Sequence, residues 1–337
     1  MIRTVRLRSL AKINLDLRVL NQRADGFHDL RTVFQTISLA DTLEIACEPA
    51  RRTTLALDDA LAIPDNLVLR AARAVLDSLK VHANVRFRLR KAIPMGGGLG
   101  GGSSNAAAVL LALPVLAGRD LPFEKLAALG AALGSDVPFF LTAGTALAVD
   151  RGTEIYNLPD VKPEPILVIT SGIHMATGAA YQALGRARFS GETQGLTSRE
   201  LSRKINGFQH FVRALGELRS AKAASAVGEN DFESAVFDRH PQLKTMWGRL
   251  RKHAAGARMT GSGSALFAVF ATKSERDDAQ KSLAGDRVFR DCRIIPAAIV
   301  SGRSYQRLWR AQLAEHLAPV NEAGNDSLWP PRSRYAR

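Results

Sequence analysis

Six of the seven residues from position 96 to position 102 are glycines, and few places in a globular fold accept such a run. It follows a predicted strand, in which Val85, Phe87 and Leu89 alternate with arginines, and it precedes an alanine- and leucine-rich helix that opens at Ser103 and Ser104. A glycine loop that leads into a helix N-terminus brings many backbone N–H groups to one anion, for which a polyphosphate is the obvious candidate. A flexible turn is the alternative, but it does not need a cluster of glycines, because each one costs conformational entropy on folding.

Two familiar phosphate-binding loops do not fit this segment. A P-loop requires Lys followed by Ser or Thr after its last glycine, whereas Gly102 is followed by Ser103 and Ser104. The spacing G-x-G-x-x-G of a dinucleotide-binding loop is present, and Asp120 lies near the distance of a ribose-binding acid. That acid should end a second parallel strand, but Asp120 precedes a predicted helix. We therefore expect neither of these folds.

The first part of the chain predicts an antiparallel sheet with helices. Apolar residues alternate over residues 5–19 on one face of a long strand, and the opposite face carries Lys12 and Asn14. The β-rich segments LRTVFQTISL and DTLEIA follow and predict a partner in the same sheet. Helical spacing predicts a helix over residues 66–80, and TALAV with TEIYNLP predicts a closing hairpin.

The length of 337 residues favours two domains, and the proline-rich segment LPDVKPEP suits the connection between them. We expect an N-terminal domain over residues 1–160, a C-terminal domain over 161–305, and a poorly ordered tail over 306–337. After the connection, the strand PILVIT, a helical region, the strands ARMT and ALFAVF, a further helix and a last strand predict a βαββαβ layer with extra helix inserted.

Lysine and arginine outnumber the acidic residues by 46 to 32, which gives a net charge of +14. This charge can attract phosphate-bearing ligands or nucleic acid, but it is spread widely and does not form one tract. The longest uncharged stretch, residues 92–118, is broken by glycines and Pro114, and the N-terminus lacks the apolar core of a secretory signal. Cys47 and Cys292 have no metal-binding spacing and fit the cytoplasm, with one disulfide as an open alternative.

The segment PMGGGLGGGSS closely resembles the second motif of the GHMP kinases, Pro-x-x-x-Gly-Leu-Gly-x-Ser-Ser, with one additional glycine. The family is named for its galactose, homoserine, mevalonate and phosphomevalonate members. The segments KINLDLRVLNQRADGFHDLRTVFQTISLADTL, LGSDVPFF and TGSGSALF extend the resemblance over residues 5–300, in the family's order and with similar spacing. The resemblance implies an α+β fold, in which an N-terminal domain similar to domain 2 of ribosomal protein S5 precedes a ferredoxin-like C-terminal domain.

The same segments resemble a branch of the family that transfers phosphate from ATP to a hydroxyl group of a cytidine-diphosphate-linked substrate, in non-mevalonate isoprenoid precursor synthesis. ATP and Mg²⁺ are the implied cofactors and a small molecule is the implied partner, with neither a membrane nor a nucleic acid expected. The seven histidines are scattered, so the sequence identifies no metal ligand. Two alternatives stay open: another GHMP small-molecule kinase, and an RNA-binding protein that uses the S5-like domain and the basic charge.

The resemblance places a catalytic pair at Lys12 and Asp136. The ammonium group of Lys12 would orient the acceptor hydroxyl and stabilise the transferring charge, and Asp136 would accept the hydroxyl proton. From the residues alone, Lys12 also fits a surface lysine, and Asp136 fits a turn or N-cap aspartate. Asn14 is expected beside Lys12 in the same polar site, in contact with substrate.

Two loops are expected at the phosphates. The third family motif, at Gly261, Ser262 and Gly263, is placed near substrate and nucleotide phosphates, where its N–H groups complete the anion site. A tight connection between two strands is the alternative for this motif. The resemblance assigns ATP binding to the glycine loop, with the residues Pro94, Met95, Gly96, Gly97, Gly98, Leu99, Gly100, Gly101, Gly102, Ser103 and Ser104.

Three ring-bearing residues are expected at the cytosine. The resemblance places His28 at the base-recognition position and Tyr181 at an aromatic position that covers the base. Phe27 stands where related sequences often have Tyr, so ring stacking is retained while a phenolic contact is lost. Without the resemblance, a buried Phe beside an exposed His is the simpler interpretation of residues 27 and 28.

Overall fold

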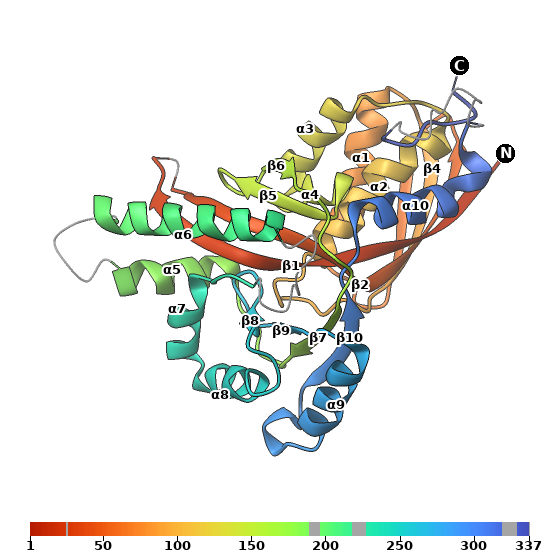
Figure 1. Cartoon of the computed structure of the whole chain (residues 1–337). Coiled ribbons are helices and arrows are strands. Elements are labelled where there is room, and N and C mark those ends of the chain that lie inside the picture. Colours follow the sequence, from red (N-terminus) through yellow and green to blue (C-terminus); the bar gives the residue numbers. More distant parts are fainter. Residues whose placement is uncertain (25, 189–195, 218–226, 319–328, 337) are drawn as a thin grey trace.

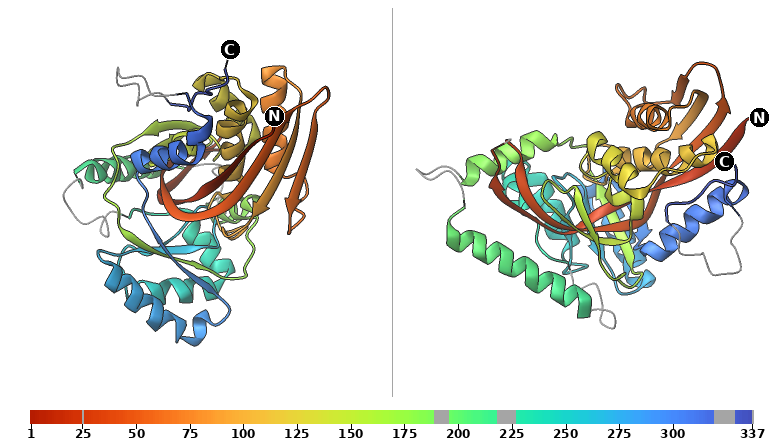
Figure 2. Two further views of the ribbon diagram at one scale, coloured as in Figure 1. Left: turned by 90° about the vertical axis from the view of Figure 1, so that its right-hand side faces the viewer. Right: turned by 90° about the horizontal axis from the view of Figure 1, so that it is seen from above.

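Two long strands, β1 (Arg3–Gln22) and β2 (His28–Pro49), form an antiparallel hairpin around which two domains are arranged (Figure 1). Both views in Figure 2 show that the hairpin is strongly curved. Three shifts of register interrupt its ladder, the first between Leu10 and Ala11, and such bulges bend a strand. The computed structural model describes residues 1–24, 26–188, 196–217, 227–318 and 329–336.

The N-terminal domain contains a six-stranded sheet in the order β3-β4-β2-β5-β6, with β1 paired to β2 off this path. Helix α2 is buried along most of its length, because alanine and leucine fill it on every side. The core of this domain forms between the helices and the sheet. The further elements are β3 (Thr54–Asp59), α1 (Leu67–Leu79), β4 (Ala83–Arg90), α2 (Gly101–Ala117), α3 (Phe123–Leu133), α4 (Phe139–Thr142), β5 (Thr145–Val149) and β6 (Glu154–Asn157).

The strand β1 differs from the half-buried strand that its alternating pattern predicts. From Ser9 to Leu20 both of its faces are buried. Leu7 belongs to the core of the N-terminal domain, whereas Ala11 and Ile13, beyond the first bulge, belong to a core shared with the second domain. The second domain therefore covers a strand that would otherwise have one solvated face.

The C-terminal domain confirms the predicted βαββαβ layer with inserted helices. Its antiparallel sheet has the order β10-β7-β9-β8, which is the ferredoxin-like arrangement. Its elements are β7 (Pro165–Thr170), α5 (Thr177–Arg188), α6 (Ser198–Glu217), α7 (Phe232–Arg239), α8 (Pro241–Leu250), β8 (Arg258–Met259), β9 (Leu266–Val269), α9 (Lys273–Ala284), η2 (Arg287–Phe289) and β10 (Arg293–Ala298).

The chain after β10 requires a correction. The expected boundary at residue 305 falls inside helix α10 (Gly302–Leu313), which η3 (Ala314–His316) follows. The described part of the tail is packed, because Trp309 and Leu313 are buried in the core of the N-terminal domain and Ser333 is buried as well. Residues 319–328 of the expected disordered tail lie outside the described residues. Apolar residues of α10 therefore return the chain to the first domain.

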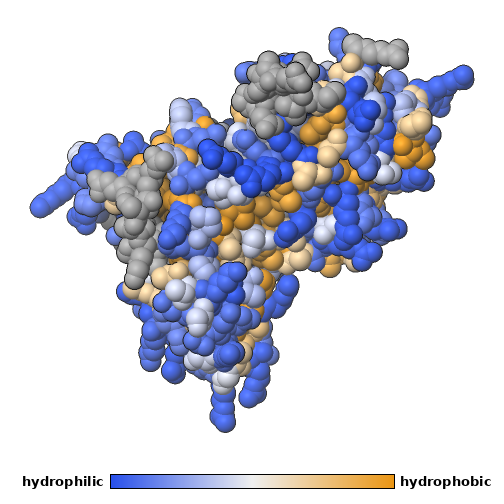
Figure 3. Space-filling view, turned by 45° about the vertical axis from the view of Figure 1, so that its right-hand side comes forward, coloured by the Kyte–Doolittle hydropathy of each residue, from blue (hydrophilic) through white to orange (hydrophobic). Residues whose placement is uncertain are grey.

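On the face drawn in Figure 3, hydrophobic residues gather in the middle of the molecule and toward its upper right edge, and hydrophilic residues dominate the rest of the surface. Within the described ranges, the structure has no helix of the length and apolar character that a membrane crossing demands.

Candidate active site

The free edge of β1 is covered by loops from both domains. The Lys12 N–H donates to Leu99 O in the glycine loop at 3.0 Å, and the Asn14 N–H donates to Thr260 Oγ1 at 3.0 Å. Further along, the Leu17 N–H donates to Glu229 O. An edge strand presents unpaired backbone groups, and here these groups align the two predicted phosphate loops on one strand.

Lys12 and Asp136 meet in the structure. The Lys12 Nζ lies 3.3 Å from Asp136 Oδ2 and 4.8 Å from the centre of the Phe34 ring. The lysine is only 3% exposed, whereas the Asp136 side chain is 31% exposed. The surface-lysine interpretation of Lys12 is therefore wrong, and Asp136 retains access to a ligand.

Asn14 connects this pair to the C-terminal domain. Its Oδ1 accepts hydrogen bonds from Lys12 Nζ at 2.8 Å and from the Gly261 N–H at 2.9 Å. Its Nδ2 donates to Thr32 Oγ1 at 2.8 Å. Asn14 therefore lies where predicted, but its side chain is engaged within the protein and orients Lys12.

The glycine loop forms one wall of a cavity of about 340 Å³. Gly96, Gly98 and Gly100 have φ of +67°, +74° and +71°, a region that glycine occupies without strain. A Cβ on Gly98 would lie 2.3 Å from Thr260 O, so close approach of the two loops also requires glycine there. Of the predicted loop residues, Pro94 to Ser103 line the cavity, whereas Ser104 is buried and does not line it.

Sequence reasoning missed three residues that shape these loops. Lys91 lines the glycine-loop cavity and forms an ion pair with the buried carboxylate of Asp41. Asp41 also accepts hydrogen bonds from the N–H groups of residues 92 and 93, at 2.8 Å each. Asn230 Nδ2 donates to Met259 O and Gly261 O at 2.8 Å and so holds the second loop. Only Lys91 had a local signal, namely its position between the strand and the glycines.

The three residues expected at the cytosine line a second cavity, of about 600 Å³, together with Asp136. We call it the aromatic cavity. The rings of His28 and Tyr181 stack with their centres 5.0 Å apart and their planes at 20°. Burial, with a smaller effect of the Asp136 charge, raises the pKa of Tyr181 to about 12, so its phenol is neutral at physiological pH. Phe27 is 54% exposed, and the Arg151 guanidinium lies 4.8 Å from its ring centre. The buried-Phe interpretation is therefore wrong.

The third motif reaches both cavities. Gly261 packs on the backbone of Gly98, and Ser262 Oγ donates to Thr177 Oγ1 at 3.3 Å in the wall of the aromatic cavity. Gly263 has a φ of +89° in the same loop. The structure thus brings the Lys12–Asp136 pair, the glycine loop and the loop of Gly261 to Gly263 to one region.

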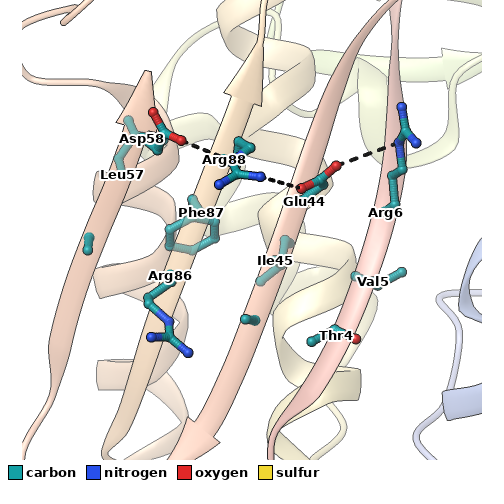
Figure 4. Close-up of a pocket in the computed structure, with 12 residues that line it drawn as sticks. Thr4, Val5, Arg6, Glu44, Ile45, Leu57, Asp58, Arg86, Phe87 and Arg88 are labelled. Atoms are coloured by element: carbon teal, nitrogen blue, oxygen red, sulfur yellow. Dashed lines mark hydrogen bonds and ion pairs between the residues drawn. The ribbon is translucent and has the colours of Figure 1, made fainter. Parts of the chain in front are cut away.

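A third hollow, of about 780 Å³, lies elsewhere, on the outer face of the N-terminal sheet. Figure 4 shows a row of alternating charges across four strands, in which Asp58 pairs with Arg88, Arg88 with Glu44, and Glu44 with Arg6. Exposed pairs of this kind stabilise a fold little. Asp58 and Glu44 interrupt the positive charge of this face. The face is therefore a poor RNA-binding surface, because RNA binding depends on basic residues that neutralise phosphates.

Comparison with known proteins defines the class of this protein, which is a kinase. Residues 66–144 match the family model for the GHMP kinases N terminal domain, and residues 208–286 match that for the GHMP kinases C terminal domain. A crystal structure of homoserine kinase from Cytophaga hutchinsonii has the same fold, with a TM-score of 0.67, 15% identity, and coverage of 88% of this chain and 95% of that chain. The chain belongs to the GHMP kinase family.

Similar proteins show to which branch of the GHMP kinase family the chain belongs. A protein of Solibacter usitatus, 49% identical over 99% of this chain and 98% of its own length, is named 4-diphosphocytidyl-2-C-methyl-D-erythritol kinase. So is one of Geobacter metallireducens, 34% identical over 83% of this chain and 94% of its own length. A crystal structure of 4-(cytidine 5'-diphospho)-2C-methyl-D-erythritol kinase has a TM-score of 0.68 and 31% identity, and covers 87% of this chain and 98% of that chain. The chain falls in the branch of the 4-diphosphocytidyl-2-C-methyl-D-erythritol kinases.

Proposed function

We propose that the protein transfers phosphate from ATP to the 2-hydroxyl group of 4-diphosphocytidyl-2-C-methyl-D-erythritol, a step of non-mevalonate isoprenoid precursor synthesis. The observation that carries the proposal is the position of the Lys12–Asp136 pair. The Lys12 side chain packs against Gly100 of the glycine-loop cavity, and Asp136 lines the aromatic cavity. The pair therefore joins a site suited to phosphates with a site suited to a base.

Asp136 acts as the proton acceptor in this proposal. Its carboxylate takes the proton of the acceptor hydroxyl as the hydroxyl oxygen bonds to phosphorus, and ADP is the leaving group. Lys12 holds a positive charge beside the same oxygen, and burial strengthens its electrostatic effect. Asn14 and the carboxylate of Asp136 orient the ammonium group.

The glycine loop has the features that ATP requires. Helix α2 begins at Gly101, and Gly100 at its N-cap offers no side chain to satisfy the first N–H groups of the helix. These N–H groups, the loop backbone and Lys91 would hold the phosphates. Mg²⁺ bound with ATP would supply further charge neutralisation. Within the part of the chain that the structure describes, no group of three or more His, Cys, Asp or Glu side chains could hold a metal ion.

The aromatic cavity supports the cytidine end of the substrate. The exposed ring of Phe27 and the neutral ring of Tyr181 offer apolar faces for a base, and His28 offers a hydrogen-bonding nitrogen. The proposal also places the enzyme in the cytoplasm, which is supported by Cys47 and Cys292, both free thiols.

The acceptor is tested by measuring ATP consumption with a panel of GHMP kinase acceptors. We expect turnover with 4-diphosphocytidyl-2-C-methyl-D-erythritol and inhibition by CDP that competes with this acceptor, because both share the cytidine diphosphate group. Turnover with homoserine or mevalonate alone would establish another GHMP kinase instead. RNA binding with a steep salt dependence and no ATP turnover would establish the RNA-binding alternative.

His28→Ala is expected to raise the KM of the cytidine-linked acceptor by about 2- to 12-fold, because a hydrogen bond to the base contributes about 0.5–1.5 kcal/mol. The KM of ATP should change less than twofold, since His28 lies in the aromatic cavity. Steady-state kinetics with each substrate varied in turn measures both values. His82→Ala, at an exposed histidine bonded to Thr53, is the matched control and should change neither KM. An equal rise of both KM values in His28→Ala would contradict the assignment.

A further inference from the structure

The turn that contains Asp136 continues directly into the short helix α4. Hydrogen bonds run from the Val137 N–H to Gly134 O, from the Phe140 N–H to Val137 O and from the Ala143 N–H to Phe139 O. The ring of Phe140 packs on Gly100, where a Cβ would lie 2.9 Å from it. Helix α4 is therefore continuous with the turn that carries Asp136 and packs on the glycine loop through Phe140.

Two donors from the C-terminal end of the chain bind the end of α4. The Tyr305 hydroxyl donates to Phe140 O at 2.6 Å, and Trp329 Nε1 donates to Leu141 O at 2.7 Å. The two rings also contact each other, with centres 6.4 Å apart and planes at 59°. Tyr305 is 2% exposed, and burial raises its pKa, so the phenol keeps the proton that it donates. The last carbonyl groups of a helix have no partner within it, and here side chains from α10 and the tail supply one.

We propose that Tyr305 and Trp329 are positioning residues for phosphoryl transfer: they fix the carbonyl end of α4 and thereby hold Asp136 in reach of the acceptor hydroxyl. The inference rests on the proposed role of Asp136. Both donors lie outside residues 66–144 and 208–286, the segments that match the family models. Figure 1 shows α10 beside the helices of the N-terminal domain, although α10 follows the whole C-terminal domain in sequence.

We expect the loss of either donor to lower kcat and to leave the affinities for ATP and acceptor unchanged. Neither residue lines the two site cavities, so ground-state binding of ATP and acceptor should persist. A displacement of about 1 Å at reacting groups can cost on the order of 100-fold in rate, and the loss of one of two donors should displace Asp136 by less. We therefore expect about a tenfold lower kcat from each single loss.

The test uses Trp329→Phe and Tyr305→Phe in the full chain, since each keeps a ring and removes one donor. The matched control is Ser333→Ala, which removes a hydrogen bond of the same tail, from Ser333 Oγ to Val115 O at 2.8 Å, at the far end of α2. We expect all three variants to show a similar small decrease of Tm. Only the two α4 donors should lower kcat, about tenfold, with both KM values within twofold of the parent. A kcat within twofold of the parent in Trp329→Phe and Tyr305→Phe, or an equal loss in Ser333→Ala, would overturn the proposal.

A double-mutant cycle with Asp136→Asn shows whether the effect passes through the carboxylate. In the Asp136→Asn background, Trp329→Phe should lower kcat less than twofold further, because the group that it positions no longer acts as a base. An undiminished tenfold loss in that background would refute positioning through Asp136. If Asp136→Asn alone leaves turnover intact, the proposed role of Asp136 fails. If Asp136→Asn is slow while the two tail variants are not, only the positioning inference fails.

Discussion

Asp136→Asn is expected to lower kcat by about 10²–10⁴-fold, the usual contribution of a positioned general base. Asparagine keeps the shape of the side chain but loses the negative charge and nearly all proton affinity. The KM values should change much less, because Asp136 acts chiefly on a proton that moves during transfer. Single-turnover phosphorylation at saturating ATP and acceptor measures the effect without interference from product release.

If Asp136 only capped a helix or stabilised a turn, Asp136→Asn would leave kcat nearly unchanged, because asparagine serves in both positions. The N-cap position of α4 is Pro138, and no side chain caps this helix, so the N-cap interpretation of Asp136 has no support in the structure. Asp286 provides a matched control, since its carboxylate accepts a hydrogen bond from the Val288 N–H at the N-cap of η2. Asp286→Asn should leave kcat unchanged, because asparagine also caps a helix. A folded Asp136→Asn enzyme with near-parental turnover would remove the catalytic assignment and leave the family and the glycine loop in place.

Lys12→Met is the second substitution for which we expect a large loss, about 10²–10³-fold in kcat, comparable to the loss of one oxyanion-stabilising donor. Methionine fills a similar volume in the buried position but carries no charge. The fold should survive, because Asn14 Oδ1 keeps its bond from the Gly261 N–H and the partly exposed Asp136 can be hydrated. Rapid-quench measurement of phosphate transfer gives the rate, and circular dichroism checks the fold.

Two further measurements give this prediction its control. Lys125→Met, at an exposed lysine of α3, removes the same charge and should leave kcat unchanged. The double variant of Lys12→Met and Asp136→Asn should be only slightly slower than the slower single variant, because the two side chains act as a unit. If the fold-loss of kcat in the double variant equalled the product of the two single losses, Lys12 and Asp136 would act independently.

The fold was largely predictable because its signals are local. Alternating apolar residues specify β1, helical spacing specifies α1, and the sequence order of strands and helices from Pro165 onward specifies the ferredoxin-like domain. The burial of both faces of β1 and the return of α10 to the first domain were not predictable in this way. They depend on which surfaces the second domain and the tail cover, and no local pattern around Lys12 or Trp309 encodes that choice.

The sequence by itself determined the strand, glycine loop and helix of residues 83–117, because the backbone freedom of glycine and the helix preference of alanine act within a few residues. It also determined membership of the family, whose motifs are contiguous segments. Only the tertiary structure decided that Lys12 meets Asp136, that Asn14 is engaged by Gly261, and that Tyr305 and Trp329 bind the end of α4. These contacts join residues far apart in the chain, and their formation depends on the packing free energy of both domains together, which no short segment contains.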